Sequence, residues 1–154
     1  NMTEAIHVRP VVSSDFPAWK LLWDGYNAFY DRHGDTALPL EVTRITWSRF
    51  FDVYEPMHAL VAESGGELVG LTHFLFHRST IQLAPSCYLQ DLFTVEAARG
   101  KGVGRRLIEE VYRHAQSSGV ERVYWHTRET NTTAMQLYDR IGEKQGSVVY
   151  RKPL

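Results

Sequence analysis

A short glycine-rich segment between a predicted strand and a predicted helix constrains the fold more than any other feature. It alternates three glycines with other residues and carries four basic side chains: Arg99-Gly100-Lys101-Gly102-Val103-Gly104-Arg105-Arg106. Glycines lack Cβ atoms, so a ligand can approach their backbone closely. The helix that follows offers unpaired N–H groups and the positive end of its dipole to an anion. The segment predicts a cradle for a pyrophosphate group, with a solvated helix start as the alternative.

The glycine spacing does not fit two common phosphate-binding motifs. A dinucleotide fingerprint, G-x-G-x-x-G, needs its third glycine at position 105, where the chain has Arg105. A P-loop needs G-x-x-x-x-G-K-[ST], which is also missing from this turn. The turn comes late in the chain, after a predicted hairpin, and does not open a βαβ unit. A nucleotide-binding α/β protein is therefore disfavoured.

The remaining pattern predicts a mixed sheet covered by helices. Strands are expected over residues 6–12, 59–62, 68–76, 88–95, 122–127 and 147–151, and helices over 16–30, 103–115 and 131–141. A further helix is expected to carry Trp47, Phe50, Phe51 and Tyr54 on one stripe and to end at Pro56. Gly65 and Gly66 between two apolar runs indicate a hairpin. A hairpin followed by strand–helix–strand–helix predicts one α/β (α+β) domain over residues 1–154.

Length and charge exclude several classes of protein. The 154 residues suffice for one domain, and 17 Lys+Arg against 18 Asp+Glu give a net charge of -1, so no basic footprint for nucleic acid is present. No apolar run approaches the roughly 20 residues that cross a bilayer, so no membrane partner is expected. The single cysteine, Cys87, cannot close an intramolecular disulfide, which favours a reducing, cytoplasmic location.

A second motif follows the glycine turn on the next predicted helix. Asn131, Ala134, Tyr138 and Gly142 come after Arg99-x-x-Gly102-x-Gly104. In this combination the sequence resembles the GNAT superfamily of acetyl-CoA-dependent N-acetyltransferases, whose cofactor motif is [RQ]-x-x-G-x-[GA]. The segments Tyr88-Leu89-Gln90-Asp91-Leu92-Phe93 and Glu129-x-Asn131 resemble two subgroups, the diamine acetyltransferases and the small yeast-type histone, polyamine and D-amino-acid acetyltransferases. The resemblance implies a mixed, mostly antiparallel sheet of six to seven strands with about four helices.

The resemblance also implies acetyl-CoA as the cosubstrate and no metal. Its pyrophosphate would be bound by Arg99, Gly100, Lys101, Gly102, Val103, Gly104 and Arg105. The strand ending at Phe93, Thr94 and Val95 would splay from the next one. Backbone groups near Phe93 and Val95 would then be free to bond the pantetheine arm and to place an N–H at the thioester carbonyl. Asn131 would fix the pantetheine, and Tyr138 would return a proton to the leaving thiolate.

The acceptor amine has a pKa near 10, so it must lose a proton before it attacks. Asp91 and Glu129 are the two carboxylates predicted to accept that proton, directly or through water. The diamine enzymes have Glu where this chain has Gln90, so the assignment between the two stays open. Tyr26 and Tyr30 are predicted to line the acceptor cleft together with Gln90 and Asp91. Asp91 could instead be a buried structural carboxylate, and Asn131 only a helix cap.

The expected function is direct transfer of an acetyl group from acetyl-CoA to a primary amine. Small amines, either polyamines or amino acids, are the first expectation for the acceptor. A lysine side chain, a protein N-terminus, or a non-catalytic acyl-CoA-binding role are the alternatives. A tyrosine at position 138 favours catalysis, because binding alone needs no proton donor at sulfur. The resemblance implies a homodimer. His73 and His77 have no third ligand nearby in the sequence, so no metal site is expected.

Overall fold

The computed structural model describes residues 5–154 and builds them around a five-stranded sheet of order β1-β2-β3-β4-β5. The strands are β1 (His7–Pro10), β2 (Met57–Ser64), β3 (Glu67–His77), β4 (Ser86–Thr94) and β5 (Val123–Tyr124). Neighbouring strands from β1 to β4 are antiparallel, whereas β5 runs parallel to β4. The predicted mixed, mostly antiparallel sheet is confirmed.

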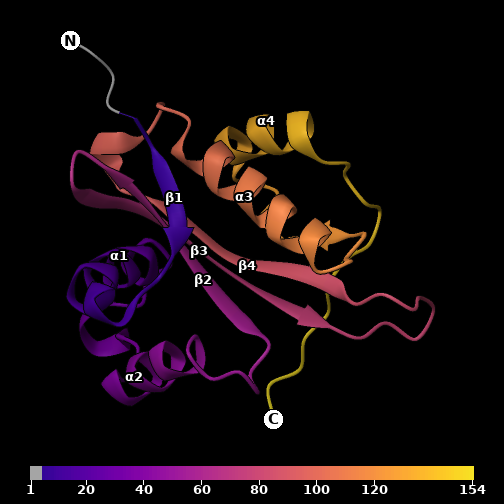
Figure 1. Ribbon diagram of the computed structural model, residues 1–154, viewed down its shortest axis with the longest axis horizontal. Helices are drawn as coiled ribbons and strands as arrows, with labels where there is room; N and C mark the ends of the chain where they lie inside the picture. Colours follow the sequence, from indigo (N-terminus) through magenta and orange to yellow (C-terminus); the bar gives the residue numbers. More distant parts are fainter. Residues whose placement is uncertain (1–4) are drawn as a thin grey trace.

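Two helices cover each face of this sheet, as Figure 1 shows. The helices α1 (Phe16–Phe29) and α2 (Leu40–Arg49) lie on one face, and α3 (Val103–Ser117) and α4 (Thr132–Ile141) lie on the other. Alternate residues of β2 separate the two cores, since Leu60 packs under α3 and Val61 packs under α1. The α3 core contains Leu107 and Ile108, and the α1 core contains Trp19, all fully buried.

A β-bulge in β4 decides which side chains face α1. His73 pairs with Asp91, but the next residue, Phe74, pairs with Leu89, so Gln90 is the extra residue of β4. Strict alternation would put Asp91 on the same face as Leu89, which packs in the α3 core. The extra residue resets the alternation and turns Asp91 toward α1.

The hairpin between β2 and β3 forms at the predicted glycines. Gly65 and Gly66 adopt φ of 61° and 79°, the left-handed region that a tight hairpin requires.

The burial of Cys87, which is 0% exposed, raises its thiol pKa to about 12, so this residue packs in the core and is no nucleophile.

Three sequence predictions about element boundaries are wrong. Residues 147–151 form no strand, and β5 covers two residues rather than 122–127, so the described residues hold five strands rather than six to seven. Val148 and Tyr150 are 75% and 92% exposed, because β5 offers too short an edge to pair with them. The helix α2 ends at Arg49, well before Pro56. Asp52 Oδ1 accepts the Tyr54 N–H at 2.9 Å and forms a turn there instead.

Gly70 of β3 lets the first turns of α3 approach the sheet. A Cβ at this buried position would lie 2.9 Å from Val103 Cγ1, 3.0 Å from the Phe93 carbonyl oxygen and 3.1 Å from Leu107 Cδ1. Contacts this short force either the helix or the strand backbone to move. The glycine therefore seats the helix whose N-terminus follows the basic turn.

Gly70→Ala is expected to lower the free energy of unfolding by about 1–3 kcal/mol, the range for overpacking a core. Gly146→Ala is the matched control, because a Cβ there meets no atom within 4 Å and the change should stay within about 0.5 kcal/mol. Urea denaturation of both variants measures the difference. Equal stabilities would contradict the close approach of α3.

Candidate active site

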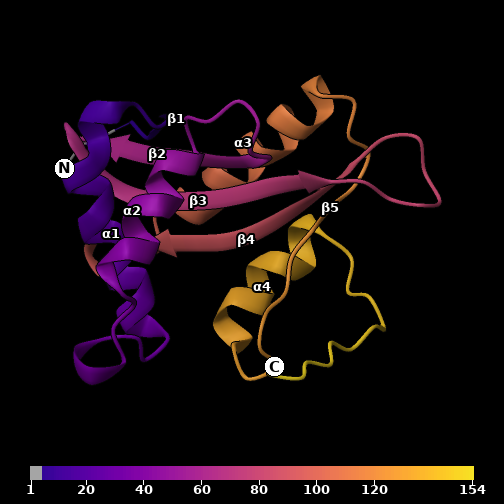
Figure 2. The same cartoon turned by 90° about the horizontal axis from the view of Figure 1, so that it is seen from below.

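The strands β4 and β5 separate after a short parallel contact. Only two residue pairs join them, Cys87 with Val123 and Tyr88 with Tyr124. Within the described chain, residues 89–94 of β4 have no strand on that side. Figure 2 shows the chain after β5 diverging from β4, with α4 beside the opening. The predicted splay is present, and it leaves one edge of β4 accessible.

The backbone groups of β4 that face this opening differ from those predicted. The Val95 N–H donates to the Val69 carbonyl at 2.9 Å, and the Phe93 carbonyl faces Gly70 of β3. Phe93 and Val95 are therefore engaged with β3 and are not free. Because backbone groups alternate along a strand, Leu92 and Thr94 face the opening instead. Of the three predicted residues Thr94 faces the opening, whereas Phe93 and Val95 face β3, since pairing direction cannot be read from the sequence alone.

The glycine turn leads from β4 into α3 with an open surface. Gly100 and Gly102 have φ of 78° and 83°, and a Cβ on either would meet no atom within 4 Å. No side chain caps α3, and its first turn of N–H groups has no partner within the helix. Arg99 Nε donates to the Thr94 carbonyl at 3.3 Å, and Arg105 pairs with Glu109 at 3.0 Å. The geometry is that of an anion site at a helix N-terminus.

A buried chain of hydrogen bonds holds Asp91 below α1. The Trp19 indole N–H donates to His73 Nε2 at 3.0 Å, and His73 Nδ1 lies 2.9 Å from Asp91 Oδ2. An indole nitrogen can only donate, so His73 Nε2 must accept and the ring carries its proton on Nδ1. The Nδ1–H then donates to the Asp91 carboxylate. The three residues are 0%, 4% and 8% exposed, so the chain is shielded from water.

Aromatic rings connect Asp91 to the end of α1. Burial raises the pKa of Tyr26, and the Asp91 carboxylate close to its hydroxyl raises that pKa further. The Tyr26 ring lies 5.0 Å from the Tyr30 ring and 6.4 Å from the Phe93 ring, measured between centroids. Tyr26, Tyr30 and Asp91, all predicted acceptor residues, therefore form one continuous group, the acceptor surface, in which Tyr26 and Asp91 are buried and Tyr30 is half-buried.

Tyr138 of α4 reaches the same surface from the other side of the opening. Burial raises the pKa of its hydroxyl, and the nearby Tyr30 hydroxyl raises it further. The Trp125 ring packs edge-on against the Tyr138 ring at 5.5 Å, which holds the tyrosine in place. Asn131 stands at the N-cap of α4, yet its side chain makes no capping hydrogen bond. Its amide is thus available for a ligand.

Two further predicted site residues are exposed. Gln90 is the bulge residue of β4. Glu129 lines a hollow of about 1210 Å³ between β5 and the C-terminal segment, which Tyr138 also lines. Of the two carboxylates proposed as a base, the structure joins Asp91, not Glu129, to Tyr26.

The sequence assigned no role in the site to four residues that the structure adds to this region. Trp19 and His73 hold Asp91, while Arg32 and Arg128 lie on the tyrosine rings. The pairing of His73 with Asp91 depends on the bulge, which leaves no signal in the sequence.

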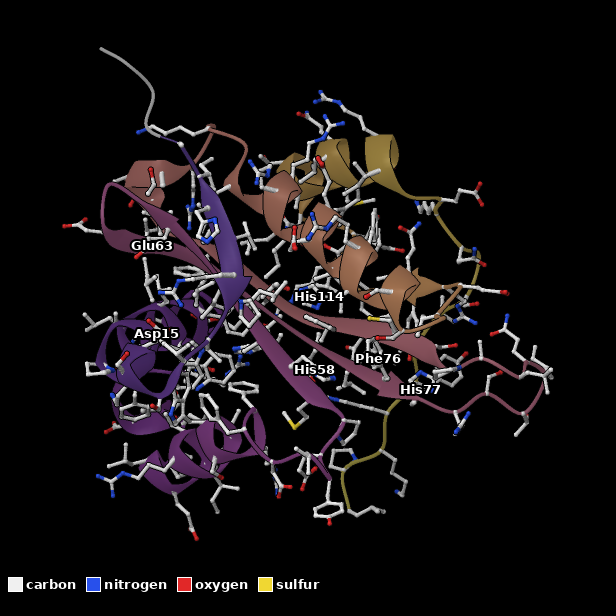
Figure 3. The ribbon with its side chains drawn as sticks, viewed as in Figure 1. Asp15, His58, Glu63, Phe76, His77 and His114 are labelled. Carbon is white, nitrogen blue, oxygen red and sulfur yellow. The ribbon has the colours of Figure 1, made fainter. Side chains whose placement is uncertain are left out.

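Two further histidines lie away from the opening. Figure 3 shows His58 and His114 on the α3 side, where both rings lie near Phe74. Burial lowers the pKa of His58, and the neighbouring His114 lowers it further. This pair therefore belongs to the packing under α3 and not to the acceptor surface.

The described chain thus combines an anion-binding turn, a splayed sheet edge and a buried carboxylate beside a tyrosine. Residues 18–142 match the model of the Acetyltransferase (GNAT) family. The chain belongs to this family and is an N-acetyltransferase.

Two relatives cover nearly the whole chain. The D-amino-acid N-acetyltransferase HPA3 of Saccharomyces cerevisiae is 34% identical over 153 residues, which cover 98% of this chain and 92% of the relative. An uncharacterized N-acetyltransferase, YhfO, of Bacillus subtilis is 29% identical over 147 residues, covering 94% and 95%. Both support the family assignment over its full length.

Solved structures share the fold at low identity. A probable acetyltransferase superposes with a TM-score of 0.82 at 20% identity, covering 96% of this chain and 97% of the other. The aminoglycoside N-acetyltransferase AAC(6')-Iy in complex with CoA superposes with a TM-score of 0.81 at 16% identity, covering 99% of this chain and 98% of the other.

No helix in the described part of the chain is long and apolar enough to cross a bilayer.

His73→Ala is expected to lower the free energy of unfolding by about 2–4 kcal/mol, because each buried polar group left unpaired costs about 1–3 kcal/mol. The control is His77→Ala on the same strand, whose bond to the Tyr124 hydroxyl at 2.7 Å is exposed. This control should change stability by less than about 1 kcal/mol. Urea denaturation measures the free energy of unfolding of both variants. Equal losses of stability would contradict the buried hydrogen-bond chain.

Proposed function

We propose that the protein transfers the acetyl group of acetyl-CoA directly to the primary amine of a small molecule, a polyamine or an amino acid. The observation that carries this proposal is the opening between β4 and β5, which joins the glycine turn to Asp91, Tyr26 and Tyr138. The relative HPA3 is named for N-acetylation of D-amino acids, and AAC(6')-Iy for that of aminoglycosides, so both take small amines.

The residues along the opening fit coenzyme A. The first-turn N–H groups of α3 and the open surface at Gly100 and Gly102 suit a diphosphate, with Arg99 and Lys101 as counter-charges. The accessible edge of β4 at Leu92 and Thr94 offers backbone hydrogen bonds to the amide-bearing arm. Asn131 adds an amide from α4. When bound, acetyl-CoA supplies an acyl group activated as a thioester.

Asp91 is suited to accept the proton that the amine must lose. Its Oδ2 accepts from His73 Nδ1–H at 2.9 Å, and the Tyr26 hydroxyl lies beside the same carboxylate, on the side from which the acceptor would approach. The Trp19 indole can only donate to His73 Nε2, so the imidazole proton sits on Nδ1 and faces the carboxylate. His73 and Trp19 act as positioning residues.

Tyr138 is suited to return a proton to the thiolate that leaves. A thiol has a pKa near 8.5, well below that of a phenol, so the transfer is helped only when the donor is close and held. Burial raises the Tyr138 pKa, which keeps the hydroxyl protonated at neutral pH. The packing of Trp125 restrains its position.

Gly102→Asp is expected to weaken acetyl-CoA binding at least 100-fold, because a carboxylate would stand among the phosphates. Gly119→Asp is the matched control, since Gly119 follows the other end of α3 with a φ of 77° and equal open space. The two variants share the backbone strain but not the charge conflict. Thermal shift with acetyl-CoA measures binding, which at 100 times Kd stabilises wild type by about 2.7 kcal/mol. Wild-type affinity in the Gly102 variant would contradict the phosphate site.

Tyr138→Phe is expected to lower kcat by roughly 10- to 1,000-fold with little change in KM, within the range of general acid catalysis. Tyr112→Phe removes a tyrosine hydroxyl of α3 that bonds the Ile141 carbonyl at 2.9 Å and has no assigned part in the transfer, so kcat should be unchanged. Thiol release from acetyl-CoA with spermidine and with alanine as acceptors measures both. Wild-type turnover by the Tyr138→Phe variant would remove the assigned role.

A further inference from the structure

Two arginines from opposite walls of the opening lie on one tyrosine ring. Arg32 Cζ is 5.5 Å from the centroid of Tyr30, and Arg128 Cζ is 5.4 Å from the same centroid. Arg32 belongs to the loop after α1, and Arg128 to the loop between β5 and α4. Residues almost a hundred positions apart in the sequence thus place two positive charges together at the acceptor surface.

These charges have no anionic partner in the described part of the chain. Neither arginine forms an ion pair with residues 5–154. The Arg32 Nε–H donates to Asn27 Oδ1 at 2.7 Å, which holds the guanidinium in place. Its two terminal nitrogens remain available to a ligand. A planar guanidinium presents these nitrogens in a fork that matches a carboxylate.

The Tyr26 ring connects this positive pair to the buried negative charge. Arg32 Cζ lies 5.8 Å from the Tyr26 centroid, and the Tyr26 hydroxyl lies beside Asp91. The site therefore has a carboxylate at its base and guanidinium groups at its mouth. A ligand with an ammonium group and a carboxylate complements both ends.

We propose that the acceptor is an amino acid, bound with its carboxylate at Arg32 and Arg128 and its amino group toward Asp91. The inference rests on the proposed acetyl transfer and selects one of its two acceptor classes. A polyamine would bring a second ammonium group against the two guanidinium groups, and this repulsion discriminates against it. Arg32 and Arg128 are thus specificity residues for the acceptor.

The experiment compares acceptors that differ only in the carboxylate. Phenylalanine, as each enantiomer, and 2-phenylethylamine are offered with acetyl-CoA, and kcat/KM is measured by thiol release. In wild type the better enantiomer should exceed the amine by about 10- to 100-fold, the effect of one hydrogen bond to a charged group. Arg128→Gln and Arg32→Lys should each lower kcat/KM for phenylalanine about 10-fold or more while changing that for the amine less than about threefold.

Arg122→Gln is the matched control, because Arg122 also lies on a tyrosine ring, 4.8 Å from the centroid of Tyr124, outside this surface. It should leave the ratio between the two acceptors unchanged. Equal use of both acceptors by wild type, or an equal loss for both in the arginine variants, overturns the carboxylate site. A rise in KM for acetyl-CoA alone would assign the arginines to the cosubstrate and overturns it as well. Failure to acetylate any amine, including spermidine, would instead remove the proposed function and the inference with it.

Discussion

The hydrogen-bond chain from Trp19 through His73 to Asp91 is the interaction on which the site depends. A carboxylate is stable away from water only when it accepts hydrogen bonds or when its charge is compensated. The bulge at Gln90 brings Asp91 to the α1 face, and the indole fixes the imidazole proton on the nitrogen that faces the carboxylate. The same three side chains therefore bury the Asp91 charge and, in the proposed transfer, position it to accept a proton.

The strand that carries Asp91, β4, also separates from β5 after two residue pairs. A strand edge without a neighbour leaves backbone donors and acceptors unsatisfied, and proteins normally cover or interrupt such an edge. Here the edge runs into the glycine turn, and the close approach of α3 at Gly70 puts the helix N-terminus beside its end. A ligand with amides and phosphates, as we propose for coenzyme A, would satisfy both the strand edge and the helix N-terminus.

The sequence alone predicted the features that depend on residues close together in the chain. The Gly65-Gly66 hairpin, the turn at Gly100 and Gly102 and the helix after it follow from backbone freedom and short-range periodicity. Features that depend on pairing were not accessible: a one-residue bulge changes the face of Asp91 and the direction of the Phe93 and Val95 backbone groups. Residues 147–151 have a high β-propensity but pair with no strand, so the prediction of a strand there from propensity alone was wrong.

Charge placement explains how one fold can be adapted to different amines. In the proposed complex the cosubstrate is bound largely by backbone N–H and C=O groups of the glycine turn and of the edge of β4. The acceptor would contact side chains instead, from the loop after α1 and the loop before α4. Two unit charges 4 Å apart interact by about 4 kcal/mol at an effective dielectric constant of 20, and by less where a side chain is exposed, as Arg128 is, so an arginine gained or lost in these loops would shift the preference between acceptors. Because the two loops lie far apart in sequence and neither forms the sheet, they can vary without disturbing Asp91 or the turn.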